Sequence, residues 1–310
     1  MRPLSPLAAR ESSRWKVHAA LLVVQFAFAS QAVEGKIAMA PLASGGENIA
    51  PAALAMVRMG GAAIVFLAFT QAFGLRQKTT WRDHLTLAGL SVLGISLNQT
   101  LFLIGLRSTT PLSAALLSVT IPVFTAVLSV LFRVEKPSLR LAIGFVLALS
   151  GVLWLTGVRQ LDRGAIIVTI NSLSYSAYLV FSRRVVARLG AWTLVTWIFV
   201  WGAALFAPYG MPILIREAPV WSTRGWMFVG YILLMPTLVA YLANAWALGK
   251  SSPTLVTIYI YLQPLIAGAL AWVQLGTALT GRAVVAGALI LAGVSVVALR
   301  PTKTLAQRGG

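Results

Sequence analysis

Three charged side chains near the N-terminus lie inside runs of sequence that are otherwise apolar. Glu34 and Lys36 lie in the run 17–40, and Arg58 lies in the run 50–73. At 1.5 Å of helix per residue, Arg58 would lie about 12 Å from the start of its run. A charge so far from water is costly and needs a partner. Arg58 could form a structural tie to carbonyl groups and Glu34, or it could attract the carboxylate of a substrate.

Polar and aromatic side chains also recur at helical spacing in later apolar runs. Asn171, Tyr175 and Tyr178, for example, are four and three residues apart and share one helix face. Amides would not face lipid, so these faces should point into a helix bundle. There they could bond helix to helix, or line a cavity for a small amphipathic solute. We expect the second role for Gln31, Asn98, Tyr175, Tyr178, Tyr241, Asn244, Tyr259 and Gln263.

The composition places these residues in a membrane protein. The chain has 310 residues, of which 58% are hydrophobic and 10% are charged, whereas soluble proteins have about 25% charged residues. The mean hydropathy is +0.85. The formal net charge is +18, but the charges lie between apolar runs rather than on one basic face, so nucleic acid is not an expected partner. The chain has no cysteine, which excludes disulfides and thiol chemistry.

The apolar runs predict an all-α membrane protein with ten transmembrane helices. The expected spans are 17–40, 50–73, 84–106, 111–132, 139–157, 164–182, 192–214, 225–247, 253–274 and 283–299. With the N-terminus inside, 17 Lys and Arg residues fall on the cytoplasmic side and 6 on the opposite side. Positive charge favours the cytoplasm, so we expect both termini there, as tails over 1–16 and 300–310.

The sequence also contains an internal repeat. Pro111 and Pro122 recur 142 positions later as Pro253 and Pro264. Each repeat would hold five helices, an odd number, so the second repeat must be inverted in the membrane. We therefore expect two inverted five-helix repeats, over 17–157 and 164–299. Inverted repeats are the architecture of alternating access, with substrate bound near the middle of the membrane.

Several short motifs strengthen this interpretation. They are Ala29–Lys36, which ends in lysine, Met56-Val57-Arg58-Met59, Arg133-Val134-Glu135-Lys136, Ser252-Pro253 and Gln263-Pro264. In this order the chain resembles the drug/metabolite transporter superfamily, in its ten-helix EamA-type branch, and most of all the bacterial exporters of aromatic amino acids. The likeness extends over 17–299. It departs at Thr277, where the second repeat should carry an acid equivalent to Glu135.

The resemblance implies a transporter of the bacterial cytoplasmic (inner) membrane that exports aromatic and other small amphipathic amino acids by alternating access. The alternative is an exporter of another small metabolite or drug in the same fold. An enzyme is not expected, because the only histidines, His18 and His84, lie near cytoplasmic ends of spans. For the same reason we expect neither a metal nor another cofactor.

The sequence leaves open how transport would be coupled to an energy source and what the other charges within the apolar runs contact. Glu34 is the only acid well inside an apolar run, so it alone could couple transport to protons, and uniport is equally consistent. Lys36 is two residues away, on another face of the helix, so the two should not pair directly. Lys36 could extend toward water or meet an acidic or carboxylate partner.

Overall fold

A computed structural model describes residues 6–75, 77–132, 139–156, 163–251, 256, 259–278 and 280–298. All regular secondary structure in these ranges is helical, as expected for an all-α protein. The expected spans 1 to 5 correspond to α1 (Pro6–Met39), α2 (Pro51–Ala72), α3 (Trp81–Ser91), the π-helical segment η2 (Val92–Ser96), α4 (Leu97–Ser108), α5 (Pro111–Ser118), α6 (Ile121–Leu131) and α7 (Leu139–Thr156).

The second half of the chain begins with the long helical stretch α8 (Arg163–Glu217). The elements that follow in this half are α9 (Thr223–Leu233), the π-helical segment η4 (Leu234–Val239), α10 (Ala240–Lys250), the 3₁₀ segment η5 (Tyr259–Leu262), α12 (Gln263–Leu275) and α13 (Gly281–Ala298). Short 3₁₀ segments η1 (Leu42–Ser44) and η3 (Ala218–Val220) follow α1 and α8. Predicted spans 6 and 7 both lie in α8, where Gly190 has φ 74° and ψ 165° and breaks the helix. Glycine tolerates this backbone conformation because it has no Cβ atom.

Six helical stretches among the described residues are long and apolar enough to cross a membrane. They are Trp15–Met39, Pro51–Ala72, Trp81–Ser108, Pro111–Leu131, Arg163–Val220 and Thr223–Lys250. Shorter apolar helices cover Ala142–Gly151, Tyr259–Leu275 and Gly281–Gly293. The number of crossings therefore stays a prediction, because length and composition alone do not count them.

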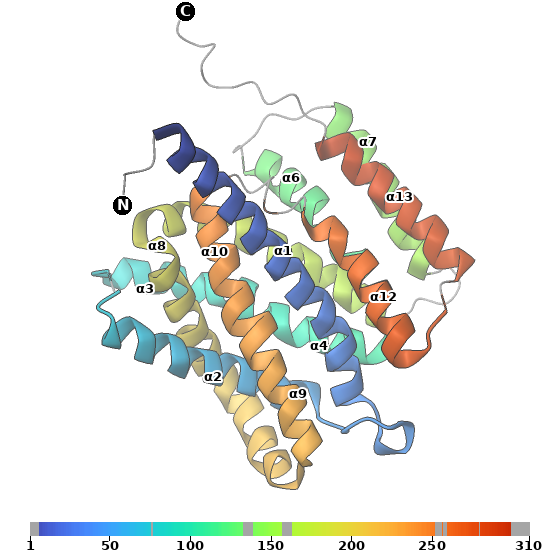
Figure 1. Ribbon diagram of the computed structural model, residues 1–310, viewed down its shortest axis with the longest axis horizontal. Coiled ribbons are helices and arrows are strands. Elements are labelled where there is room, and N and C mark those ends of the chain that lie inside the picture. The colour runs from blue at the N-terminus through green and yellow to red at the C-terminus, as the bar shows by residue number, and fades with distance from the viewer. Residues whose placement is uncertain are drawn as a thin grey trace, which may run out of the picture.

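Helices of the two halves begin in the same register. α3 and α9 begin 142 positions apart, as do the two π-helical segments, α6 and α12, and α7 and α13. This is the offset that the sequence indicates. α7 and α13 also pack against each other at one edge of the molecule (Figure 1). There Gly151 allows a close approach, because a Cβ atom at this position would lie 2.6 Å from Cγ1 of Ile290.

Local sequence signals fix where these helices begin. Thr80 and Asp83 form a capping box at the start of α3, which satisfies backbone donors that a helix N-terminus leaves free. Pro122 and Pro264 lie in the first turns of α6 and α12, and Pro236 lies within η4. A proline in the first turn of a helix costs little, because the N–H group that it lacks has no partner there.

Candidate functional site

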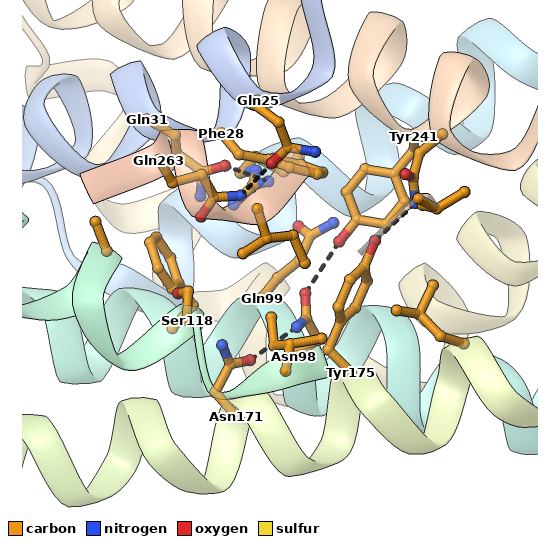
Figure 2. Close-up of a pocket in the computed structure, with 18 residues that line it drawn as sticks. Gln25, Phe28, Gln31, Asn98, Gln99, Ser118, Asn171, Tyr175, Tyr241 and Gln263 are labelled. Carbon is orange, nitrogen blue, oxygen red and sulfur yellow. Dashed lines mark hydrogen bonds between the residues drawn. The ribbon is translucent and has the colours of Figure 1, made fainter. Parts of the chain in front are cut away.

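A cavity lies among α1, α2, α4, α5, α8, α10 and α12, with α1 and α10 packed against each other on one side of it (Figures 1 and 2). About 70 Å³ is open to the centres of water-sized spheres, which is room for several water molecules. Six of the eight predicted site residues line it, namely Gln31, Asn98, Tyr175, Tyr241, Asn244 and Gln263. Residues from both halves of the sequence thus meet in one place.

The other two predicted residues have packing contacts instead. Tyr178 is buried and its ring stacks on that of Tyr175, with centroids 5.6 Å apart. The Tyr259 hydroxyl contacts the His18 ring on α1. Neither residue is among those that line the cavity. Tyr259 and Gln263 are four residues apart, but Tyr259 belongs to η5, and α12 begins only at Gln263.

One wall of the cavity is held by a chain of hydrogen bonds between α10, α4 and α8. The Tyr241 hydroxyl donates to Oδ1 of Asn98 at 3.0 Å, and Nδ2 of Asn98 donates to Oδ1 of Asn171 at 2.8 Å. Nδ2 of Asn244 donates to the Tyr175 hydroxyl at 3.0 Å. Figure 2 shows these bonds between side chains of three helices. The predicted residues therefore bond helix to helix and line the cavity at the same time.

The opposite wall includes Gln25, which the sequence interpretation missed. Its Oε1 accepts a hydrogen bond of 2.7 Å from Nε2 of Gln263, which joins α1 to α12. Gln25, Phe28 and Gln31 all line the cavity and are spaced by three residues. That spacing places them on one face of α1, so the sequence did carry a signal for Gln25.

Arg58 lies in the cavity wall and is 2% exposed. Its Nε donates to Oγ1 of Thr237 in η4 at 2.9 Å, and its Nη2 donates to Oε1 of Gln31 at 3.1 Å. Its Nη1 is buried and has no hydrogen-bond partner. Glu34, one of the partners considered for Arg58 in a structural tie, is not among these contacts. Oε1 of Glu34 instead accepts a hydrogen bond of 3.1 Å from Nε2 of Gln274 on α12.

Arg58 is consequently a buried cation without a counter-charge among the described side chains. The ion pairs within that part of the chain join Asp83 to Arg188 and Glu47 to Arg224. A buried charge that is not paired destabilises a protein by several kcal/mol. Neutral acceptors offset part of this cost at two of the three guanidinium nitrogens. The third nitrogen, Nη1, has no hydrogen-bond partner among the described groups.

Lys36 lies at the other end of α4 from the cavity and bonds to backbone. Its Nζ donates to the carbonyl oxygens of Leu106, Arg107 and Thr109, at 3.1, 2.8 and 2.7 Å. These carbonyl groups lie at the C-terminal end of α4, where a helix leaves carbonyl oxygens without i+4 partners; that of Leu106 also accepts from the backbone N–H of Thr109. A cation at the negative end of the helix dipole is stabilising, so Lys36 fixes the contact between α1 and the end of α4.

Gln99 is the second residue that the sequence interpretation missed. It lines the cavity, is 1% exposed, and neither its Oε1 nor its Nε2 has a hydrogen-bond partner. Asn98 and Phe102 are four residues apart and share a helix face, whereas Gln99 lies about 100° further around the helix. The cavity is wide enough at α4 to include all three.

The cavity thus offers amides, tyrosine hydroxyls, aromatic rings and one guanidinium group. The described residues contain no cluster of three or more His, Asp or Glu side chains that could hold a metal ion. Glu34, the sequence candidate for proton coupling, is not among the lining residues. This set of groups is suited to reversible binding of a small solute with both polar and aromatic parts.

Comparisons with known proteins agree with a transport function. The model of the EamA-like transporter family matches residues 15–157 and 162–299. The uncharacterized transporter YdfC of Bacillus subtilis is 26% identical, over 84% of this chain and 86% of its own. The uncharacterized inner membrane transporter YedA of Escherichia coli strain K12 is 27% identical, over 77% of this chain and 76% of its own.

Two further matches concern an exporter and a solved structure. A probable terminal-alkyne amino-acid exporter of Streptantibioticus cattleyicolor is 25% identical, over 83% of this chain and 86% of its own. A protein crystal structure with 22% identity has a similar fold, with a TM-score of 0.63 over 94% of this chain and 99% of its own. Since the family model covers nearly the whole chain, the protein belongs to the EamA-like transporter family of the drug/metabolite transporter superfamily and is a multi-pass membrane protein.

Proposed function

We propose that the protein exports amino acids, including aromatic ones, across the cytoplasmic (inner) membrane by alternating access. The observation that carries this proposal is the free Nη1 of Arg58 in the cavity wall. A substrate carboxylate would pair with the guanidinium group, and such charge-assisted hydrogen bonds are about twice as strong as neutral ones. The named function of the Streptantibioticus relative, amino-acid export, supports the same substrate class.

The remaining groups of the cavity suit the other parts of an amino acid. Phe28, Phe102 and Tyr175 offer rings against which an aromatic or apolar side chain can pack. The amide and hydroxyl groups offer neutral hydrogen-bond partners. Neutral partners bind weakly enough for release on the other side of the membrane. A cationic drug would lie beside Arg58 with no acidic group among the described lining residues, so we do not favour that alternative.

Transport by alternating access rests on the proposed architecture of ten crossings. We infer two inverted five-helix repeats, over 17–157 and 164–299, with cytoplasmic tails over 1–16 and 300–310. The common offset of 142 positions between helix starts supports this inference. So does the position of the first turn of α1 and the last turn of α13 in the same, upper part of Figure 1. The charge distribution of the sequence favours the same orientation.

The orientation has a direct test. A reporter that is active only in the cytoplasm should be active when fused after Gly310, and a periplasmic reporter fused there should be inactive. The same pair fused within the predicted outward loop between α8 and α9, at Val220, should give the opposite result. A C-terminus that reports periplasmic would rule out ten crossings with a cytoplasmic N-terminus.

The function itself can be tested by counterflow in proteoliposomes. Vesicles that contain the purified protein and unlabelled phenylalanine should accumulate labelled phenylalanine from outside, because exchange needs no energy source. Protein-free vesicles provide the control. Saturable exchange of phenylalanine or another amino acid would support the proposal. Exchange of a cationic drug without exchange of any amino acid would contradict it and favour the alternative substrate class.

A further inference from the structure

Two residues in the cavity wall have buried polar atoms that no described group satisfies. They are Arg58, through Nη1, and Gln99, through both Oε1 and Nε2. Buried polar atoms nearly always have partners in folded proteins, and a missing partner costs about 1–3 kcal/mol. By contrast, the amides of Asn98, Gln25 and Gln263 in the same cavity are all hydrogen-bonded to neighbours. Oε1 of Gln99 therefore takes no part in the hydrogen bonds that hold the cavity wall together.

The side chains of Arg58 and Gln99 both line the cavity, and both interact with Tyr241. The Tyr241 hydroxyl interacts with the charge of Arg58 and, by a weak hydrogen-bonding contact, with the side-chain amide of Gln99. That hydroxyl donates its own proton to Oδ1 of Asn98, so Oε1 of Gln99 receives no hydrogen bond from it. Figure 2 shows the end of Gln99 directed toward the side chains of α1, among which Gln31 is bonded to Arg58.

We propose that Gln99 selects α-amino acids by binding the carboxylate and the ammonium group of the substrate together. This inference rests on the function proposed above. An amide has a donor and an acceptor on one carbon atom, and an α-amino acid likewise has its two charged groups on one carbon atom. Nε2 of Gln99 and Nη1 of Arg58 would donate to the carboxylate. Oε1 of Gln99 would accept from the ammonium group.

The environment of Gln99 makes its side-chain oxygen a suitable acceptor. No carboxylate is among the described residues that line the cavity, so a neutral oxygen must accept from the ammonium group. The amide oxygens of Gln25, Gln31, Asn98 and Asn171 already accept from neighbouring side chains. Oε1 of Gln99 accepts from none. A compound with a carboxylate but no ammonium group would bond only to Nε2 of Gln99, and a compound with an ammonium group but no carboxylate only to Oε1.

The test compares phenylalanine with 3-phenylpropionate, which lacks the ammonium group, and phenethylamine, which lacks the carboxylate. Each compound competes with labelled phenylalanine in the counterflow assay. For the wild-type protein, both analogues should compete at least about tenfold more weakly than phenylalanine, as expected for the loss of one hydrogen bond to a charged group. In Gln99→Met, the preference for phenylalanine over 3-phenylpropionate should fall by about the same factor.

Stability measurements separate this role from a structural one. Gln99→Met keeps the length of the side chain and removes two unsatisfied polar atoms, so its thermal unfolding midpoint should equal or exceed that of the wild type. The matched control is Gln25→Met, which breaks the bond to Gln263 and should lower the midpoint. A drop for Gln99→Met as large as that for Gln25→Met would assign Gln99 to the fold and overturn the proposal.

The remaining outcomes are also decisive. If wild-type protein exchanges phenylalanine and Gln99→Met keeps the full preference over 3-phenylpropionate, this inference fails while the proposed function stands. If the wild type exchanges no amino acid, the proposed function fails and this inference with it. Should Gln99→Met not fold, Gln99→Glu replaces it. Its carboxylate repels the substrate carboxylate and attracts the ammonium group, so phenethylamine should compete better than phenylalanine, and an unchanged order would overturn the proposal.

Discussion

Replacing Arg58 with glutamine should reduce exchange of phenylalanine by roughly 30- to 1,000-fold while the protein still folds. The reason is that Arg58→Gln removes the cation that pairs with the substrate carboxylate, and loss of one partner of a buried charge pair costs about 2–4 kcal/mol. The protein itself loses two neutral hydrogen bonds, to Thr237 and Gln31, and also an unpaired buried charge. The measurement is initial counterflow rate against substrate concentration, together with the yield of monodisperse protein in detergent.

Thr237→Val is the matched control for this prediction. It removes the acceptor of Arg58 Nε but leaves the guanidinium charge beside the cavity, so exchange should stay within about threefold of the wild type, as for one neutral hydrogen bond. A well-folded Arg58→Gln protein with undiminished exchange would contradict the role of Arg58 in substrate binding. A low folded yield with normal exchange per molecule would assign Arg58 to the fold.

Gly164→Ala should destabilise the protein by about 1–3 kcal/mol, the usual cost of overpacking. At this position α8 passes α4 so closely that a Cβ atom would lie 2.6 Å from the carbonyl oxygen of Gly105 and 2.9 Å from the carbonyl carbon of Ser108. Both are backbone atoms that cannot rotate away. Since α8 carries Asn171 and Tyr175 into the cavity, displacement of this contact should also reduce exchange. Thermal unfolding in detergent and counterflow rates measure the two effects.

Gly89→Ala provides the control for this substitution. Gly89 is exposed within α3, and no atom outside its own helix lies within 4 Å of a Cβ atom built there. Alanine favours a helix over glycine by about 0.5–1 kcal/mol, so this variant should be at least as stable as the wild type. Equal stability of the two alanine variants would show that α4 and α8 can separate at no cost.

Much of the fold could be predicted from the sequence because apolar runs, and the residues that begin and end helices, are local signals. The run 50–73 corresponds to α2 (Pro51–Ala72), and the offset of 142 between Pro122 and Pro264 recurs between the starts of α6 and α12. Helical spacing likewise indicated that Asn171 and Tyr175 share a face, and both line the cavity. Such periodic patterns depend only on the geometry of one helix.

The parts that could not be predicted depend on which helices are neighbours. Nothing local indicates that Glu34 bonds to Gln274, 240 residues later, rather than to Arg58. Tyr259 fails for a different reason, because the spacing rule assumes a continuous α-helix and η5 is a 3₁₀ segment. For Gln99 the signal is weaker still. A buried amide without a partner becomes visible only when its surroundings are known.

The paired π-helical segments bear on the history of the chain. Val92–Ser96 and Leu234–Val239 begin at equivalent positions, yet their residues, Val-Leu-Gly-Ile-Ser and Leu-Met-Pro-Thr-Leu-Val, have little in common. This is the pattern expected if an ancestral gene for one half already encoded the π-turn before it was copied. The two segments have different partners in the present structure. Gly94 is overlain by the Tyr178 ring, whereas Thr237 accepts from Arg58, so under this history one irregularity of the helix came to serve two different contacts.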